Sequence, residues 1–129
     1  MKNILAALML AAAPAAIAAD SKPAEAAAPA KVDREFKSVN IEVKGNKIWT
    51  PSVFIVKKGE KVRITLVNTA PSGVHAFEID GYPETKASVD NKEGANTKTV
   101  EFTASKTGLF RVYCPMHAAH VGGQLLVLE

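Results

Sequence analysis

The stretch that decides the fold lies near the C-terminus and reads Gly108-Leu109-Phe110-Arg111-Val112-Tyr113-Cys114, followed by Pro115-Met116-His117-Ala118-Ala119-His120. Phe110, Val112 and Cys114 fall on one face of an extended strand, because side chains alternate between the two faces. Cys114 is therefore predicted to be the last inward-pointing residue of a core strand. The loop after it brings His117 back beside the thiol, and Gly122-Gly123 lets the chain bend into a final strand.

Short β-rich runs occupy the rest of the chain from Phe36 onward. Apolar residues alternate with polar neighbours over 39–43, 62–66 and 97–103, and shorter apolar runs cover 53–56 and 124–128. The stretch 57–60 is typical of a tight turn, and the polar stretch 80–96 is predicted to be a loop because it contains two glycines and a proline. Seven to eight strands at this spacing, with no long helix, predict an all-β sandwich or barrel.

The N-terminus has the pattern of an export signal. Lys2 precedes an apolar, alanine-rich stretch, and Ala16-Ile17-Ala18 has the small-x-small pattern of a signal-peptidase site. We expect a signal peptide over 1–19, cleaved after Ala18 or Ala19, and a bacterial periplasmic location. The apolar run is too short for a comfortable transmembrane span of about 20 residues, so no stable membrane insertion is expected.

Composition divides the remainder into two parts. Residues 20–35 are rich in Ala, Pro and Lys without a periodic apolar face, which predicts a flexible linker before a folded domain over 36–129. The formal net charge of +3 is mild and evenly spread, which argues against nucleic acid as a partner. The single cysteine, Cys114, cannot form an internal disulfide. It is a buried bystander, an intermolecular link or a thiolate kept for chemistry.

A third histidine has a placement that matches the Cys114 loop. His75, Phe77 and Ile79 alternate with their neighbours, so His75 lies on the apolar face at the start of a strand. If that strand is a neighbour of the strand ending at Cys114, the two residues meet at one end of the sandwich. Thiolate and imidazole ligands suit copper or zinc, and a His₂Cys set is typical of copper electron-transfer sites.

These stretches resemble the cupredoxin family, over about residues 32–129. The resemblance rests on Cys-x-x-His beside a C-terminal strand and on the segments 48–51, 53–60, 75–79, 99–102 and 108–114. It implies a Greek-key sandwich and one copper ion that cycles between Cu(I) and Cu(II). It also implies that His75, Cys114 and His117 are the equatorial ligands.

The axial position departs from the family pattern, because no methionine follows His117. His120 stands roughly where plastocyanin-like loops place that methionine, and in this respect the loop partly resembles nitrosocyanin, a red copper protein. An imidazole in this position should pull copper toward a tetragonal geometry and favour Cu(II). The site is therefore predicted to be green, red or weakly coloured. Met116 could also be an axial ligand, although packing is its simpler role.

Several functions agree with these residues. The first is a periplasmic electron carrier, not an enzyme, with a redox partner protein that docks around His117. The second is a copper carrier or chaperone that exchanges metal with a donor or acceptor. The third is an open site for a small molecule such as nitric oxide, and a structural zinc site also fits the spacing.

Overall fold

Nine β-strands make up the described part of the chain, which is residues 30–71 and 73–129 of this computed structural model. The predicted signal peptide, and residues 20–29 of the predicted linker, lie outside the described residues. The strands are β1 (Arg34–Val43), β2 (Asn46–Thr50), β3 (Val53–Lys57), β4 (Lys61–Asn68), β5 (His75–Ile79), β6 (Tyr82–Val89), β7 (Thr97–Thr103), β8 (Gly108–Tyr113) and β9 (Gly123–Leu128). The predicted all-β class is confirmed. The described residues contain no helix long and apolar enough to cross a membrane.

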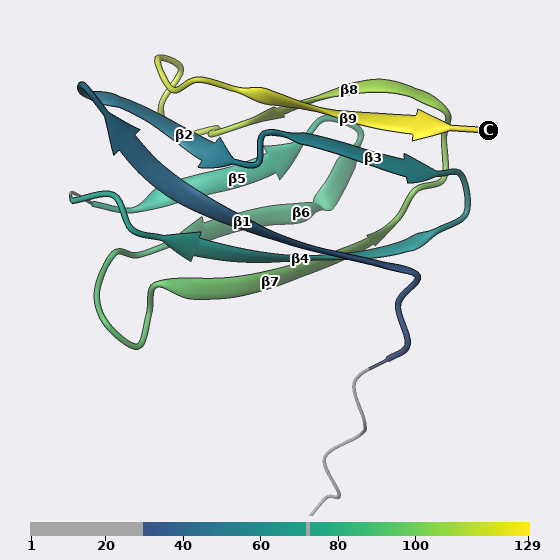
Figure 1. Ribbon diagram of the computed structural model, residues 1–129, viewed down its shortest axis with the longest axis horizontal. Coiled ribbons are helices and arrows are strands. Elements are labelled where there is room, and N and C mark those ends of the chain that lie inside the picture. Colours follow the sequence, from purple (N-terminus) through teal and green to yellow (C-terminus); the bar gives the residue numbers. More distant parts are fainter. Residues whose placement is uncertain (1–29, 72) are drawn as a thin grey trace, which may run out of the picture.

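The strands form two sheets that pack face to face (Figure 1). One sheet has the order β2-β1-β4-β7 and the other has the order β3-β9-β8-β5-β6. β1 pairs with β4, and β3 with β9, in parallel; the remaining ladders are antiparallel. The loop between β8 and β9 lies at the end of the sandwich opposite to the C-terminus (Figure 1).

The core lies between the sheets and follows the alternation of the strands. On β4, the predicted alternation is confirmed, since Val62, Ile64 and Leu66 are fully buried. Phe54 and Phe77 are also fully buried, with their rings in an edge-to-face contact. This apolar centre supports β5 and β8, whose ends carry the residues singled out for metal binding.

The prediction of a loop over 80–96 is wrong for its first half, where β6 forms. Its buried residues, Tyr82, Thr85 and Val89, do not follow strict alternation, and the β5–β6 register shifts between Phe77 and Ile79. β6 lies at the edge of its sheet, where Pro83 near the strand start is tolerated. A polar edge strand with a bulge gives a weak sequence signal. β6 and the short β2, which none of the predicted apolar runs covers, bring the strand count to nine.

β1 buries the opposite face from the one that its apolar alternation suggests. Ser38 and Asn40 point inward and are buried, whereas Val43 is 54% exposed. The Ser38 hydroxyl lies 3.1 Å from the carbonyl oxygen of Pro51, to which it donates a hydrogen bond. A buried polar side chain is tolerated where it finds such a partner.

Candidate metal centre

His75 is the first residue of β5 and is 2% exposed. β5 and β8 are antiparallel neighbours, with Glu78 opposite Tyr113, so the start of β5 lies beside the segment that follows Cys114. The sequence argument depended on these strands being neighbours, and the structure confirms it. His75 and the loop residues therefore meet at one end of the sandwich.

Two short turns fold the ligand loop over this end. The backbone N–H of His117 donates to the carbonyl of Cys114 at 3.3 Å, and that of His120 donates to the carbonyl of His117 at 3.1 Å. One residue further, the N–H of Val121 donates to the carbonyl of Lys47 at 3.1 Å. The loop is thus attached to β2, in the other sheet from β8 and β9.

The two glycines that follow the loop are required by close backbone approach. A Cβ atom on Gly122 would lie 2.8 Å from the carbonyl oxygen of Val112, and one on Gly123 would collide with the carbonyl oxygen of Ser52. The same Ser52 oxygen accepts a hydrogen bond from the N–H of Gln124 at 2.8 Å. Any side chain at 123 would push β9 away from β3 and so displace the loop.

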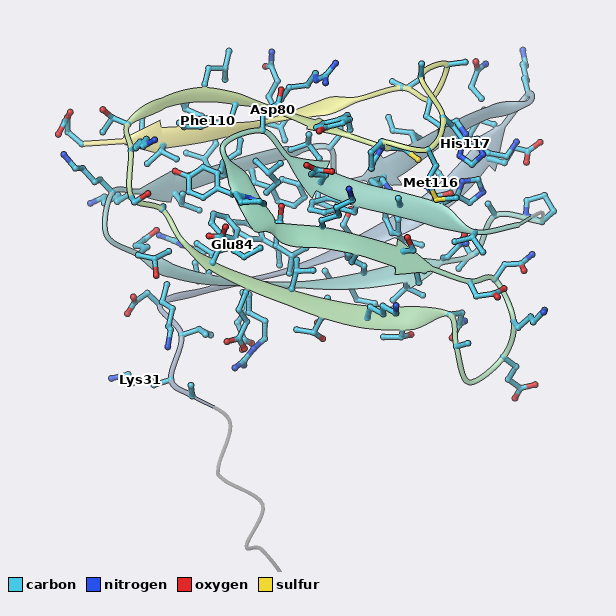
Figure 2. All side chains as sticks on the ribbon, turned by 180° about the vertical axis from the view of Figure 1, so that it is seen from behind. Lys31, Asp80, Glu84, Phe110, Met116 and His117 are labelled. Atoms are coloured by element: carbon cyan, nitrogen blue, oxygen red, sulfur yellow. The ribbon has the colours of Figure 1, made fainter. Side chains whose placement is uncertain are left out.

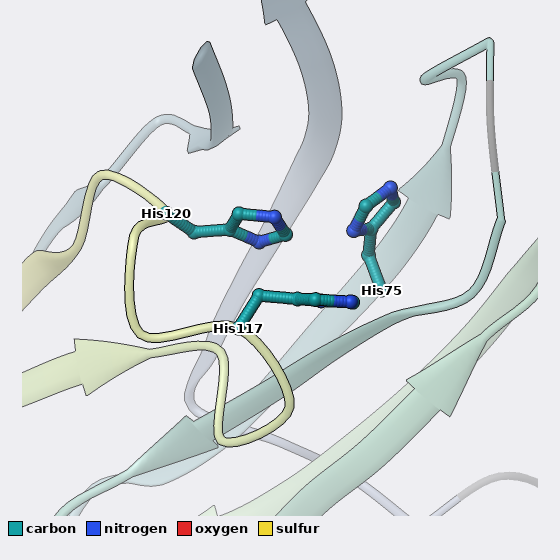
Figure 3. A group of neighbouring side chains, drawn as sticks. All are labelled: His75, His117 and His120. Carbon is teal, nitrogen blue, oxygen red and sulfur yellow. The ribbon is translucent and has the colours of Figure 1, made fainter. Parts of the chain in front are cut away.

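Three imidazoles converge at this end. Each of His75, His117 and His120 offers a ring nitrogen, and these atoms lie within 4.8 Å of one another. The rings point toward a common centre, His75 from β5 and the other two from the loop (Figure 3). The rings of His117 and His120 are stacked, with centroids 4.5 Å apart. The spacing suits one metal ion shared by three ligands.

Cys114 adjoins this group through His117. Its thiol is buried, 6% exposed, and Sγ lies 3.5 Å from Nδ1 of His117. The sulfur is not part of the tight group of three nitrogen atoms. Thiol and imidazole donors at this spacing fit a soft or borderline metal ion.

The surroundings of His120 favour the neutral imidazole. Burial, followed by the positive charges that His117, His75 and Lys47 can carry, lowers the pKa of His120 below its ordinary value. Its Nδ1 atom is buried without a hydrogen-bond partner among the described residues. A neutral ring with such an atom is suited to bind a metal, since ligation needs the free lone pair.

Two hollows of about 350 and 340 Å³ open on this centre, and His117 and His120 line both. Arg111 and Tyr113 line the first, and Lys47 and Met116 line the second. His117 is exposed, and it lies with Met116 at one end of the sandwich (Figure 2). Solvent therefore reaches the three imidazoles through these two hollows beside the loop.

Met116 is 54% exposed, and its sulfur lies 3.9 Å from the hydroxyl of Ser88. This exposure gives no support to the packing role expected for it. Its sulfur is near the centre without being among the converging nitrogen atoms.

Tyr113 lies on the opposite face of β8 from Cys114. The guanidinium of Arg111 stacks on its ring at 4.0 Å and also pairs with Asp80 at 3.2 Å. Burial and the negative charge of Glu78 raise the pKa of the Tyr113 hydroxyl above its ordinary value. Tyr113 is thus neutral and held in place beside the centre.

Sequence reasoning missed Lys47. It follows a turn in the β1–β2 hairpin and pairs with Glu42 at 3.3 Å, its partner across the hairpin. Its ammonium group acts electrostatically on His120, and its side chain lines the second hollow. No sequence signal distinguishes it from the other lysines of the chain, because its proximity depends on the loop reaching over to β2.

Comparisons with known proteins agree with the two-sheet fold. The sequence matches the family model of the cupredoxin-like domain over residues 4–127. It is similar to the crystal structure of a multicopper oxidase, with 17% identity and a TM-score of 0.64 over 75% of this chain and 45% of that chain. A copper nitrite reductase from Nitrosomonas europaea gives 26% identity and a TM-score of 0.58, over 73% of this chain and 41% of that chain.

Auracyanin from Roseiflexus castenholzii gives 18% identity and a TM-score of 0.57, over 77% of this chain and 100% of that chain. The chain thus spans less than half the length of the oxidase and the reductase and matches auracyanin over its full length. No curated protein sequence matches significantly. The family match extends over most of the sequence, and the two-sheet fold agrees with it. This chain belongs to the cupredoxin-like domain family.

Proposed function

We propose that this protein binds one copper ion and carries one electron by cycling it between Cu(I) and Cu(II). The observation that carries the proposal is the convergence of three imidazole nitrogen atoms within 4.8 Å beside a buried thiol. Two structural neighbours support the choice of copper, since a multicopper oxidase and a copper nitrite reductase share the fold. Bound copper would supply the redox couple, and the chain would hold the ligands.

In this proposal His75, Cys114 and His117 would hold the metal, and His120 would be the fourth ligand. His75 is fixed in a strand, which limits the movement of the site when the charge of the metal changes. A site that barely rearranges lowers the cost of outer-sphere electron transfer. His117 is the exposed ligand and therefore the route by which an electron would leave.

A redox partner protein would dock around His117. Met116 is 54% exposed and Val121 is 48% exposed, which gives the loop an apolar surface beside the exposed imidazole. Apolar contact surfaces with few charges are typical of the centre of protein interfaces. A copper donor or acceptor could use the same surface.

Export to the periplasm is part of the proposal. It rests on the sequence of residues 1–19, followed by the predicted linker, whose last two residues belong to β1, and by the copper-binding domain. N-terminal sequencing of the protein from a periplasmic fraction should show cleavage after Ala18 or Ala19. Recovery of the uncleaved chain in the cytoplasmic fraction would contradict it.

The first test is an optical and EPR spectrum of the mature protein with one equivalent of Cu(II), beside Cys114→Ala and Met116→Leu. We expect a thiolate-to-copper charge-transfer band that is lost in Cys114→Ala and kept in Met116→Leu. Its position should correspond to a green or red site; an intense blue band would argue against His120 as a ligand. Absence of any such band, with tight zinc binding instead, would rule out the electron-carrier function.

The two hollows beside the centre favour a second candidate function, an open site for a small molecule such as nitric oxide. Nitric oxide added to the copper-loaded protein should then change its EPR signal at stoichiometric concentration. A signal that stays unchanged would leave the electron carrier, whereas rapid transfer of Cu(I) to a chelator would indicate a copper carrier.

A further inference from the structure

A buried asparagine, Asn68, ends β4 at the metal end of the sandwich and is 1% exposed. Its side-chain N–H groups donate to the carbonyls of Gly73 at 3.1 Å and of Val89 at 2.9 Å. Its side-chain oxygen accepts a hydrogen bond from the N–H of Ala70 at 3.1 Å. Both amide hydrogens and the amide oxygen thus have partners, and all of those partners are backbone groups.

The two carbonyls that accept from the Asn68 side chain both lie close to His75, one along the chain and one across the sheet. Gly73 is two residues before His75, and Val89 is the residue opposite His75 in the β5–β6 ladder. Asn68 belongs to one sheet, whereas β5 and β6 belong to the other. Its side chain therefore ties the two sheets together at the point where His75 begins its strand.

The other side of His75 is held by a second buried donor. The indole N–H of Trp49, on β2, donates to the carbonyl of Ala76 at 2.9 Å. The backbone on both sides of His75 is thus hydrogen-bonded to residues of the opposite sheet. A buried network with every member satisfied rigidifies the groups it joins.

We propose that Asn68 is a positioning residue for His75, which keeps this imidazole in its ligating place before the metal arrives. The inference rests on the proposed function, because it assigns a role within the same copper site. Without the Asn68 amide, the carbonyls of Gly73 and Val89 lose their donors and the segment before His75 is released from β4. The His75 side chain would then have to be ordered each time copper binds, and the conformational entropy lost in that step weakens the binding of copper.

The test uses two variants and a matched control in the mature protein. Asn68→Ala removes all three hydrogen bonds, and Asn68→Ser keeps a short hydroxyl that can restore one of them. Thr85→Val is the control, since Thr85 is also fully buried and its hydroxyl bonds the N–H of Ile79 and the carbonyl of Tyr82. Those partners lie farther along β5 and at the far end of β6 from His75.

Copper affinity is measured by competition with a chelator, EPR reports the ligand geometry, and urea unfolding of the metal-free protein reports stability. Asn68→Ala should lower the copper affinity about 10- to 100-fold and change the Cu(II) hyperfine splitting. Asn68→Ser should recover part of the affinity, and Thr85→Val should lose stability with unchanged affinity. Equal copper affinity in Asn68→Ala and Thr85→Val would overturn the inference.

A metal-free measurement keeps this test separate from the proposed function. Imidazole NMR signals of His75 in the metal-free protein should broaden or shift in Asn68→Ala and stay in place in Thr85→Val. If the unmodified protein failed to bind copper, the proposed function would fall while these signals still decided whether Asn68 positions His75. If Asn68→Ala does not fold, Asn68→Ser carries the comparison, and a native His75 signal with native affinity there would count against the inference.

Discussion

Replacement of Trp49 by phenylalanine should weaken the fold through one lost hydrogen bond. Trp49 is 4% exposed, its ring meets Phe77 edge to face, and its N–H reaches the carbonyl of Ala76. Phenylalanine keeps an aromatic ring but no donor, and a buried carbonyl that loses its donor costs about 1–3 kcal/mol. The smaller ring adds roughly 1 kcal/mol of lost burial. We expect the free energy of unfolding to fall by about 2–4 kcal/mol.

Urea unfolding of the metal-free protein, followed by circular dichroism, measures this loss. Tyr82→Phe is the control, because Tyr82 is equally buried and packs on Phe102, while its hydroxyl makes only longer bonds, 3.3 and 3.4 Å, to the backbone of Lys106. The control should cost no more than about 1 kcal/mol. Equal losses in the two variants would refute the reasoning, since the difference rests on the Ala76 hydrogen bond.

Three further variants test the charges and ligands around the centre. His120→Gln should move the copper spectrum toward blue and raise the reduction potential, because a weaker fourth ligand favours Cu(II) less; an unchanged spectrum would show that His120 does not bind. Lys47→Gln removes a cation beside the centre and should lower the potential, measured by redox titration, whereas Lys44→Gln on the same hairpin should leave it unchanged. The backbone N–H of Lys57 and a neighbouring guanidinium lower the pKa of Glu60. The ionised carboxylate therefore stabilises the fold at pH values above the ordinary carboxyl pKa, and this stabilisation is lost as the pH falls through the lowered pKa. Glu60→Gln should therefore be less stable than the parent protein at neutral pH, and urea unfolding should show the difference disappearing in acid.

The part of the site that could be predicted from the sequence is the part set by local alternation. Val112 on β8 and Cys114, the residue directly after β8, are both buried, as the alternation of side chains predicts. His75 could be placed by the same argument together with the hypothesis that β5 and β8 are neighbours. The structure confirms that these two strands are paired. A Cys-x-x-His spacing then needs only a short turn to bring His117 beside the thiol, and the structure forms that turn.

Other features of the fold and the site depend on which strands and loops lie side by side. The periodicity of apolar residues along one strand carries no information on its neighbours. The inward face of β1 carries Ser38 and Asn40, and the Ser38 hydroxyl donates to the carbonyl of Pro51, which directly follows β2. The sequence predicts that Gly123 permits a bend. The structure gives a different reason for glycine there: the carbonyl oxygen of Ser52, directly before β3, lies where a Cβ atom would stand. Lys47 approaches His120 only because the loop crosses to β2. Such contacts join residues that are far apart in the sequence, so they could be identified only from the three-dimensional structure.

The candidate ligands are held in two different ways, and this bears on how the site would take up its metal. His75 is buried, and the backbone around it is hydrogen-bonded to side chains of the opposite sheet, Asn68 and Trp49. His117 and His120 lie on a loop that is more exposed and whose hydrogen bonds run along its own backbone and to Lys47. A metal arriving from solvent would therefore meet the exposed His117 before the buried His75. In the proposed copper site, a fixed His75 would keep the geometry constant during electron transfer, and the exposed His117 would give the metal access. This difference between His75 and the loop predicts the effects of variants. Substitutions of the residues that hold His75, Asn68 and Trp49, should alter the geometry of the site, and substitutions in the loop should alter the rate at which metal enters and leaves.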